Sequence, residues 1–214
     1  MALSKTSPES ANPDADAADA EPALHLVTAA ALAGDPNALR GLLTALSPDM
    51  ARVARCVLGS TAPELDDVVQ ESLLGLLRAL PQFRGESSLR RFANRIAVRT
   101  AIASRRRARK RAADNQRLAN EPVAGALIVE QGPEGDYLSA RREALLRRLL
   151  DELPEVQAET LALRVLLGFS LEETAAATAA PENTVRSRLR LAREALRARI
   201  EREPGLLDLF GGER

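Results

Sequence analysis

Arginine is the residue type in this sequence whose number and spacing indicate a binding function. Residues 84–111 hold ten arginines and one lysine against Glu86 as the only acid, and residues 184–202 hold seven arginines against Glu194 and Glu201. In the second segment, arginines 186, 190, 193 and 197 recur at helical spacing. Positive side chains gathered in this way are typical of a chain that meets a polyanion at two places.

Residues suited to catalysis are scarce. The 214 residues include one His, one Cys and no Trp, so a nucleophilic dyad or a metal cluster would be built almost entirely from carboxylates. We therefore predict a protein that is not an enzyme, with no catalytic residue, no metal site and no cofactor. The sequence shows no secretory signal and no apolar run near the ~20 residues that cross a bilayer. The expected location is the cytoplasm, without a membrane partner.

The elements that must position these arginines are helices. Period-3.6 apolar spacing runs from Pro22 to Arg111 and resumes at Tyr137, and no alternating strand pattern occurs. The pairs Asp35-Pro36 and Ser47-Pro48 each place a cap residue before a proline suited to the first helical position. The predicted helices span 22–33, 36–46, 48–59, 63–80, Ser88 onward, 138–152, 154–167, 171–178 and 184–202.

Composition divides the chain into two domains. Residues 112–136 combine Gly, Pro and acids without a sustained period, which predicts a flexible linker. Residues 1–21 contain no aromatic residue and no large aliphatic residue beyond Leu3. Burial therefore cannot offset their ordering entropy, and we expect a disordered tail. The prediction is an all-α fold with small helical domains at 22–111 and 137–203 and a C-terminal tail at 204–214.

The second domain carries a helix-turn-helix pattern. Ser170 and Glu173 form a capping box that starts a short helix, and Asn183 is the expected N-cap of the next. That helix aligns Val185, Leu189, Ala192, Leu196 and Ile200 on one face, which leaves the arginines on another. The second helix of such a motif reads base edges in the major groove with its N-terminal residues. The alternative is a solvated terminal helix laced by salt bridges.

In the first domain, the turn-rich loop 83–88 leads into the basic helix. Its apolar stripe is Leu89, Phe92, Ile96 and Ile102 with Ala93, Ala97 and Ala103. Phe83 and Phe92 lie beside arginines, as in sites that stack unpaired bases. The alternative for both rings is packing in the core.

The helix at 63–80 has two different faces. Its predicted inward stripe is Leu65, Val69, Leu76 and Leu80. The opposite stripe is Asp67, Glu71, Leu74 and Arg78, flanked by Asp66 and Gln70. An acidic face with an apolar centre is either solvated or serves a protein partner.

These motifs, in this order, resemble the extracytoplasmic-function (ECF) sigma factors, small two-domain members of the sigma-70 family. The resemblance covers residues 24–111, similar to sigma region 2, and 138–200, similar to sigma region 4. The region 2 motifs are Gly34-Asp-Pro-Asn-Ala-Leu39, Asp66-Asp-Val-Val-Gln-Glu71, Phe83-Arg-Gly-Glu-Ser-Ser88 and Arg95-Ile-Ala97. The region 4 motifs are Leu153-Pro154, Gly168-Phe-Ser-Leu-Glu-Glu173, Thr184-Val-Arg-Ser-Arg-Leu189 and Ala192-Arg-Glu-Ala-Leu196.

The resemblance implies an RNA polymerase sigma factor that directs transcription initiation at promoters. Its implied partners are core RNA polymerase, through the β′ clamp and β flap, promoter DNA, and an anti-sigma factor. The implied polymerase-binding residues are Asp66, Asp67, Gln70 and Glu71. The implied −10 DNA-binding residues are Phe83, Arg84, Ser87, Ser88, Arg91, Phe92, Asn94, Arg95, Arg99, Arg105 and Arg106. The implied −35 DNA-binding residues are Asn183, Thr184, Arg186, Ser187, Arg188 and Arg190.

The sequence departs from the family pattern at several positions. Asn94 stands where Tyr is common, Phe92 where Trp is common, and Leu89 where an aromatic residue is frequent, which reduces the surface for strand capture. Ala179 stands where the turn usually has Gly. The rival readings are a stand-alone dimeric helix-turn-helix regulator and a helical adaptor protein. The sigma factor interpretation also requires that the arginines of the two basic segments are free to contact DNA and are not paired with acids of the same chain.

Overall fold

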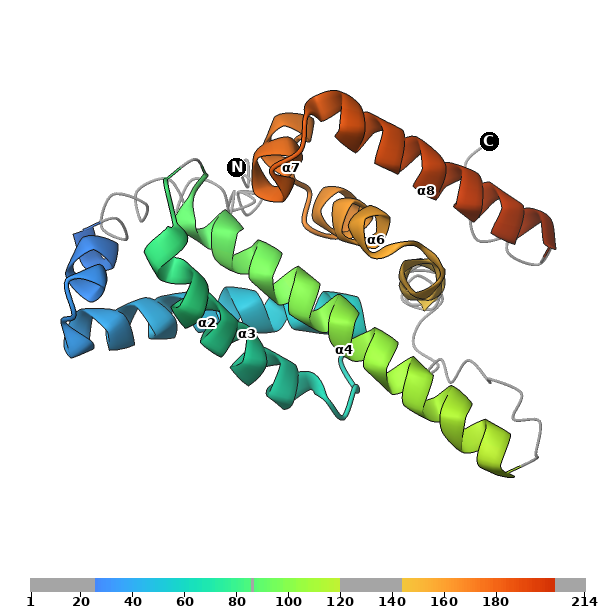
Figure 1. The fold of residues 1–214 in the computed structure, drawn as a ribbon, viewed down its shortest axis with the longest axis horizontal. Helices are drawn as coiled ribbons and strands as arrows, with labels where there is room; N and C mark the ends of the chain where they lie inside the picture. Colours follow the sequence, from blue (N-terminus) through green and yellow to red (C-terminus); the bar gives the residue numbers. More distant parts are fainter. Residues whose placement is uncertain (1–25, 86, 120–143, 203–214) are drawn as a thin grey trace, which may run out of the picture. The chain divides into compact units, whose positions relative to one another are not determined.

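A computed structural model describes residues 26–85, 87–119 and 144–202, and within these ranges the regular elements are all helices (Figure 1). The all-α fold class is confirmed. The predicted tails at 1–21 and 204–214 lie outside the described residues. Contacts divide the chain into the compact units Met1–Ala45 and Leu46–Arg214. The division into domains at 22–111 and 137–203 stays a prediction.

Helix α2, Pro36–Leu58, corrects one expectation, because it continues through Pro48 where two helices were predicted. Its start is as expected, since the Asp35 Oδ1 accepts the Asn37 N–H at 2.8 Å. A proline inside a helix costs roughly 3 kcal/mol, whereas each large apolar side chain that is fully buried contributes about 1.5–3 kcal/mol. The continuous helix keeps one fully buried stripe on both sides of Pro48, formed by Leu42, Leu46, Met50, Val53 and Val57.

Helix α3, Leu65–Ala79, is followed by the short 3-10 helix η1, Leu80–Gln82, and then by the long helix α4, Leu89–Ala119. Helix α3 packs along α4 (Figure 1). Gly75 permits the approach, because a Cβ there would lie 3.1 Å from the Ile96 Cγ2. The buried residues of α3 are Val68, Ser72 and Leu76. The inward face is therefore turned slightly from the predicted one, and Leu65 and Val69 are half-buried.

Helix α4 is longer than predicted. It begins where the Ser88 Oγ accepts the Arg91 N–H at 3.3 Å, and it extends to Ala119, beyond the predicted start of the linker at residue 112. Residues 112–119 are mostly good helix formers and contain no Gly or Pro, so nothing local ends the helix at Arg111. The remainder of the predicted linker, 120–136, lies outside the described residues.

The C-terminal part of the chain contains helical residues 144–152, α6 Glu155–Leu161, the π-helix η2 Ala162–Leu166, α7 Leu171–Thr178 and α8 Glu182–Arg202. Leu149, Leu150 and Leu163 are fully buried, and Leu196 and Ile200 of α8 pack on Leu145. The predicted helix 154–167 thus has nearly the right extent, although its last turn is a π-helix. Gly168, at φ 68°, ends it as expected.

Candidate nucleic-acid interface

Helices α7 and α8 form the predicted helix-turn-helix. The Ser170 Oγ accepts the Glu173 N–H at 3.0 Å, and the Glu173 Oε2 accepts the Ser170 N–H at 2.8 Å, so the capping box is confirmed. The turn places Ala179 in the left-handed region, at φ 48° and ψ 42°. The N-cap prediction for Asn183 is wrong. Helix α8 begins at Glu182, two residues before the predicted start at residue 184, and the Pro181 carbonyl accepts the N–H groups of Thr184 and Val185.

The left-handed residue predicts a stabilising substitution. A non-glycine residue in this region costs roughly 1–2 kcal/mol, part of which glycine loses again to unfolded-state entropy. We expect Ala179→Gly to raise the free energy of unfolding by about 0.5–1 kcal/mol and the melting temperature by about 2 °C, measured by circular dichroism. Ala176→Gly, at an exposed position inside α7, should lower the stability by about 1 kcal/mol. Equal losses in both variants would contradict the strain at Ala179.

Helix α8 buries the predicted stripe and exposes its arginines. Val185, Leu189 and Ala192 are buried. The residues expected to read the −35 duplex are all at least partly accessible. Exposed are Asn183, Arg186, Ser187 and Arg190, and half-buried are Thr184 and Arg188. Two of these arginines make ion pairs within the helix, from Arg186 Nη2 to Glu182 Oε2 at 2.9 Å and from Arg190 Nη1 to Glu194 Oε1 at 2.5 Å. All four of these side chains are at least 45% exposed, so the pairs are weak and the arginines can be shared with DNA.

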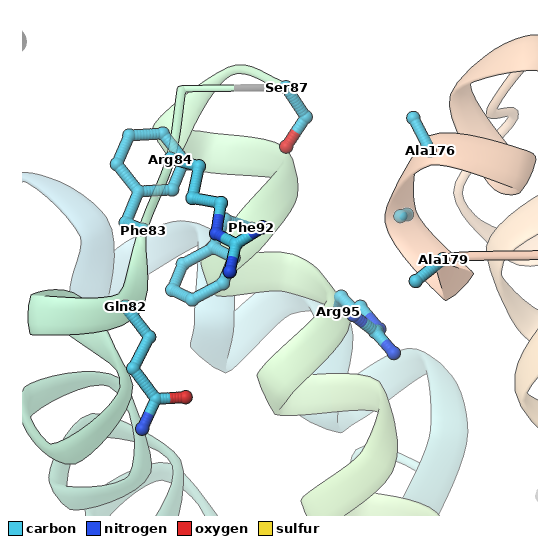
Figure 2. A pocket seen from close by; sticks show the side chains of 9 residues that line it. Gln82, Phe83, Arg84, Ser87, Phe92, Arg95, Ala176 and Ala179 are labelled. Carbon is cyan, nitrogen blue, oxygen red and sulfur yellow. The ribbon is translucent and has the colours of Figure 1, made fainter.

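The loop before α4 forms a small pocket with the start of that helix. The Phe83 and Phe92 rings lie 5.1 Å apart between centroids at an interplanar angle of 49°. The pocket measures about 110 Å³, and Figure 2 shows the side chains that line it from two parts of the chain. The lining residues are Gln82, Phe83, Arg84, Ser87, Phe92 and Arg95 on one side and Ala176, Ala177 and Ala179 on the other.

Most arginines of α4 that were expected to meet DNA contact the C-terminal part of the chain instead. Arg95 Nε donates to Glu159 Oε1 at 3.0 Å. Arg105 Nε donates to Asp151 Oδ1 at 2.8 Å, and Arg105 Nη2 donates to Asp151 Oδ2 at 2.5 Å. Arg91 Nη2 lies 2.6 Å from Glu173 Oε1. The requirement that these side chains be free of internal pairs is therefore not met in this conformation.

The remaining −10 candidates divide by their exposure. Arg84 and Arg99 are exposed, whereas Ser87 and Ser88 are half-buried. Asn94 is a correction, because it is only 7% exposed and lies on the buried face of α4 with Val98 and Ala101. Its side chain is not available to DNA in this conformation.

The acidic ridge of α3, which we define as Asp66, Asp67, Gln70 and Glu71, is exposed along its length. Leu74, one turn farther on, is 51% exposed. Glu71 Oε2 lies 2.7 Å from Arg107 Nη2 of α4 in a pair with both side chains about half exposed. The exposed face that the sequence predicts for this helix is therefore present, with an apolar residue beside the acids.

Sequence reasoning missed three acidic residues at this interface. Asp151, Glu159 and Glu173 hold the arginines of α4, and Glu173 was assigned only to the capping box. The one local signal was Glu159, a carboxylate in a largely apolar stretch of the sequence. The structure buries residues 158–163, and Glu159 with them. Among the described residues, no group of three or more His, Cys, Asp and Glu side chains could hold a metal ion. No helix in the described ranges has the length and apolar character to span a bilayer.

Comparison with known proteins places this arrangement in a family. The family model for ECF sigma factors matches residues 25–202. The ECF RNA polymerase sigma-E factor of Salmonella typhimurium (strain LT2) is 36% identical over 173 residues, which cover 78% of this chain and 89% of that protein. The ECF RNA polymerase sigma factor SigD of Mycobacterium tuberculosis (strain H37Rv) is 37% identical over 168 residues, covering 76% of this chain and 77% of that one.

A solved structure shares the fold. CnrH, in complex with the cytosolic domain of CnrY, superposes with a TM-score of 0.50 at 21% identity and covers 83% of this chain and 97% of its own. The family match spans most of the chain, and the two sequence relatives each exceed a third identity over three quarters of it. Together with the helix-turn-helix and the basic helix described above, these matches establish that the chain belongs to the family of ECF sigma factors.

Proposed function

We propose that this sigma factor divides its work among three surfaces, while RNA polymerase supplies the chemistry of RNA synthesis. The acidic ridge of α3 docks on the β′ clamp of core polymerase. Loop 83–88 and the first turns of α4 capture the opened −10 strand. The N-terminal half of α8 reads the −35 duplex. Sigma factors are non-catalytic initiation factors, so no active site is needed for this role.

The exposed start of α8 is the observation that carries the −35 assignment. Arg186 and Arg190 project from a helix whose opposite stripe is buried, and the capped helix α7 and the left-handed turn at Ala179 lead into it. Residues at this end of a second helix reach base edges in the major groove, and arginine donates two hydrogen bonds to guanine there. Exposed pairs with Glu182 and Glu194 cost little to exchange for DNA.

The −10 assignment rests on the pocket at Phe83 and Phe92. Two aromatic rings beside the exposed Arg84 combine a stacking surface with a cation for the backbone of a single strand. The ridge of α3 lies on the same segment of the chain but carries acids, so it repels DNA and favours a protein partner.

Further partners follow from the family. The CnrH structure contains the cytosolic domain of a second protein, CnrY, and this supports a protein inhibitor of the anti-sigma type for our chain as well. Contact of the second domain with the β flap and a cytoplasmic location, where polymerase acts, complete the proposal. The family match counts against a stand-alone dimeric regulator.

Run-off transcription tests the proposed function directly. Purified core polymerase is combined with this chain and a fragmented bacterial genome, and start sites that appear only with the chain are sequenced. We expect a set of start sites that share −10 and −35 elements. Core polymerase alone is the control. Absence of any chain-dependent start site, or tight binding of the free chain to palindromic duplexes, would contradict the proposal.

Substitution at Phe83 separates base stacking from core packing. If the ring stacks on a base, Phe83→Ala should weaken binding of the −10 strand by the holoenzyme by about 1–3 kcal/mol. Phe83→Leu keeps most of the apolar volume and loses the aromatic face, so it should be nearly as weak as the alanine variant. Fluorescence anisotropy with a labelled −10 strand measures both. Wild-type affinity in the leucine variant would show that the ring only packs in the core.

A further inference from the structure

We propose that Asp49 of α2 positions the −10 pocket by holding Arg90 in the first turn of α4. The proposal rests on the proposed role of that pocket in strand capture, and it adds to that role a residue that does not line the pocket. Arg90 Nη1 donates to Asp49 Oδ2, and the two side chains are 31% and 24% exposed. The residues are 41 positions apart in the sequence, so the pair ties one helix to another.

The first turn of α4 draws its anions from other elements. The turn contains Arg90 and Arg91 and no acidic residue. Cations at this end of a helix oppose the helix dipole, and a carboxylate beside them offsets that cost. Glu173 of α7 pairs with Arg91, and Asp49 is the acid that α2 supplies to Arg90. Removing the charge of Asp49 therefore weakens the turn at which loop 83–88 becomes a helix.

Arg90 lies between two pocket residues in the sequence. Ser87 comes before it and Phe92 two residues after it, and both line the pocket (Figure 2). Residues two apart lie on nearly opposite sides of an α-helix. The pair with Asp49 thus holds one side of the first turn, while the Phe92 ring on the other side lies 5.1 Å from the Phe83 ring between centroids. Arg90 can fix the place of the turn without occupying the surface offered to a base.

Asp49 stands on a firmly packed part of α2. Pro48, directly before it, fixes one dihedral angle of the backbone. The other carboxylate oxygen of Asp49 lies 3.8 Å from Arg52 Nη2, whose side chain is 56% exposed, so Arg90 is the closer partner. The carboxylate is therefore held in place by its own helix, as a group that positions another must be. The fully buried residues nearest to it on α2 are Leu46, Met50 and Val53.

Buried polar atoms beside the pair make its loss costly. Arg90 Nε and, one turn farther along α4, Asn94 Oδ1 are buried and have no hydrogen-bond partner among the residues that the structure describes. A guanidinium that is partly withdrawn from water depends on the bonds that it does make. Without Asp49, the charge of Arg90 is stabilised by moving toward solvent, and that movement carries the first turn of α4 and the Phe92 ring with it.

General electrostatics and positioning predict effects of opposite sign. Removing an acid from a domain that binds a polyanion should strengthen binding, and it would also free Arg90 for a phosphate. The positioning role predicts weaker binding, because the pocket loses its geometry although the domain gains positive charge. The substitution Asp49→Asn therefore distinguishes the two accounts by the direction of its effect.

The test compares holoenzymes that carry wild-type chain or the Asp49→Asn variant. Fluorescence anisotropy measures three affinities: of the holoenzyme for a labelled −10 strand, of the holoenzyme for a −35 duplex, and of the chain for core polymerase. We expect binding of the −10 strand to weaken about tenfold and the other two affinities to stay within about twofold. Unchanged or tighter binding of the −10 strand would overturn the proposal. Equal losses in all three affinities would also overturn it, since they would indicate general destabilisation.

A double-mutant cycle tests whether Asp49 acts through Arg90. Arg90→Gln should show a similar loss, and the combination with Asp49→Asn should bind no more weakly than Arg90→Gln alone, because the pair is already broken. Arg52→Gln is the matched control, since it removes the other cation near Asp49 from an exposed position. It should bind the −10 strand within about twofold of wild type. Additive losses in the combined variant would mean that Arg90 meets the strand directly, and the positioning role would be wrong.

This proposal and the proposed function fail in different ways. If the wild-type holoenzyme binds no −10 strand, the proposed function of the pocket is wrong whatever the variants do. If the wild-type holoenzyme binds the strand and the Asp49→Asn holoenzyme binds it equally well, only the positioning role of Asp49 is wrong.

Discussion

Replacing Asp67 by arginine should weaken binding of core polymerase by about 100-fold and abolish promoter-specific transcription at limiting concentrations. Asp67 is exposed on the acidic ridge of α3, and docking on a polymerase surface of opposite charge would turn into a like-charge contact, which costs several kcal/mol. A tenfold change in affinity corresponds to about 1.4 kcal/mol. Loss of an acid from the first turn of α3 costs the helix only about 0.3–1 kcal/mol, so folding should survive.

The control for this prediction carries the same change of charge elsewhere. Glu201→Arg lies at an exposed position near the end of α8, where a cation is favourable. Analytical size-exclusion chromatography and anisotropy with labelled chain measure binding to core polymerase. If the Asp67→Arg variant binds core polymerase as tightly as the Glu201→Arg variant does, the docking surface does not lie on α3. Glu71 is a poorer choice because its pair with Arg107 would be broken as well.

Local features of the fold could be predicted from the sequence because short-range rules determine them. The capping box of Ser170 and Glu173, the buried stripe of α8 and the exposed face of α3 each depend on residues within about two turns of one another. The continuity of α2 could not be predicted in this way. It depends on whether burial on both sides of Pro48 outweighs the lost hydrogen bond, which is a property of the packed core.

The sequence predicted which residue types form the candidate site, but it did not predict the partners that the arginines of α4 have in the structure. Arginine density identified α4, yet the partners of those arginines lie far along the chain, at a separation of 64 residues for Arg95 and Glu159 and 46 for Arg105 and Asp151. No periodic pattern connects such positions. Asn94 shows the opposite error, since a polar residue was expected at the surface and the register of α4 places it inside.

The two proposed DNA surfaces differ in how their arginines are paired. On α8 the pairs are within one helix and widely exposed, at 65% and 52% for Arg190 and Glu194. On α4 the Arg95–Glu159 pair is between distant segments and largely buried. Exposed pairs exchange readily with DNA, whereas partly buried ones resist. We therefore expect Arg190 to exchange its partner for DNA more readily than Arg95 does.

Removing two arginines from α8 should produce the second large effect. We expect Arg186→Ala with Arg190→Ala to reduce the affinity of the holoenzyme for −35 duplex by about 2–6 kcal/mol, since each arginine that reads a base contributes roughly 1–3 kcal/mol. The two positions are one helical turn apart, so the effects of the two substitutions on the binding free energy can be non-additive. The single variants are therefore measured as well. Competition with duplexes changed at each −35 base pair gives the specificity. The base pair that an arginine reads should lose its influence when that arginine is absent.

Arginines farther along the same helix provide the matched control. Arg193→Ala with Arg197→Ala removes the same charge from exposed positions of α8 that lie away from its N-terminal end. If these side chains meet only phosphates, binding should weaken equally for all sequences, and the dependence on salt should become shallower. The pair at 186 and 190 should instead alter sequence preference. Equal, sequence-independent losses in both double variants would mean that α8 grips the backbone and that the −35 bases are read elsewhere.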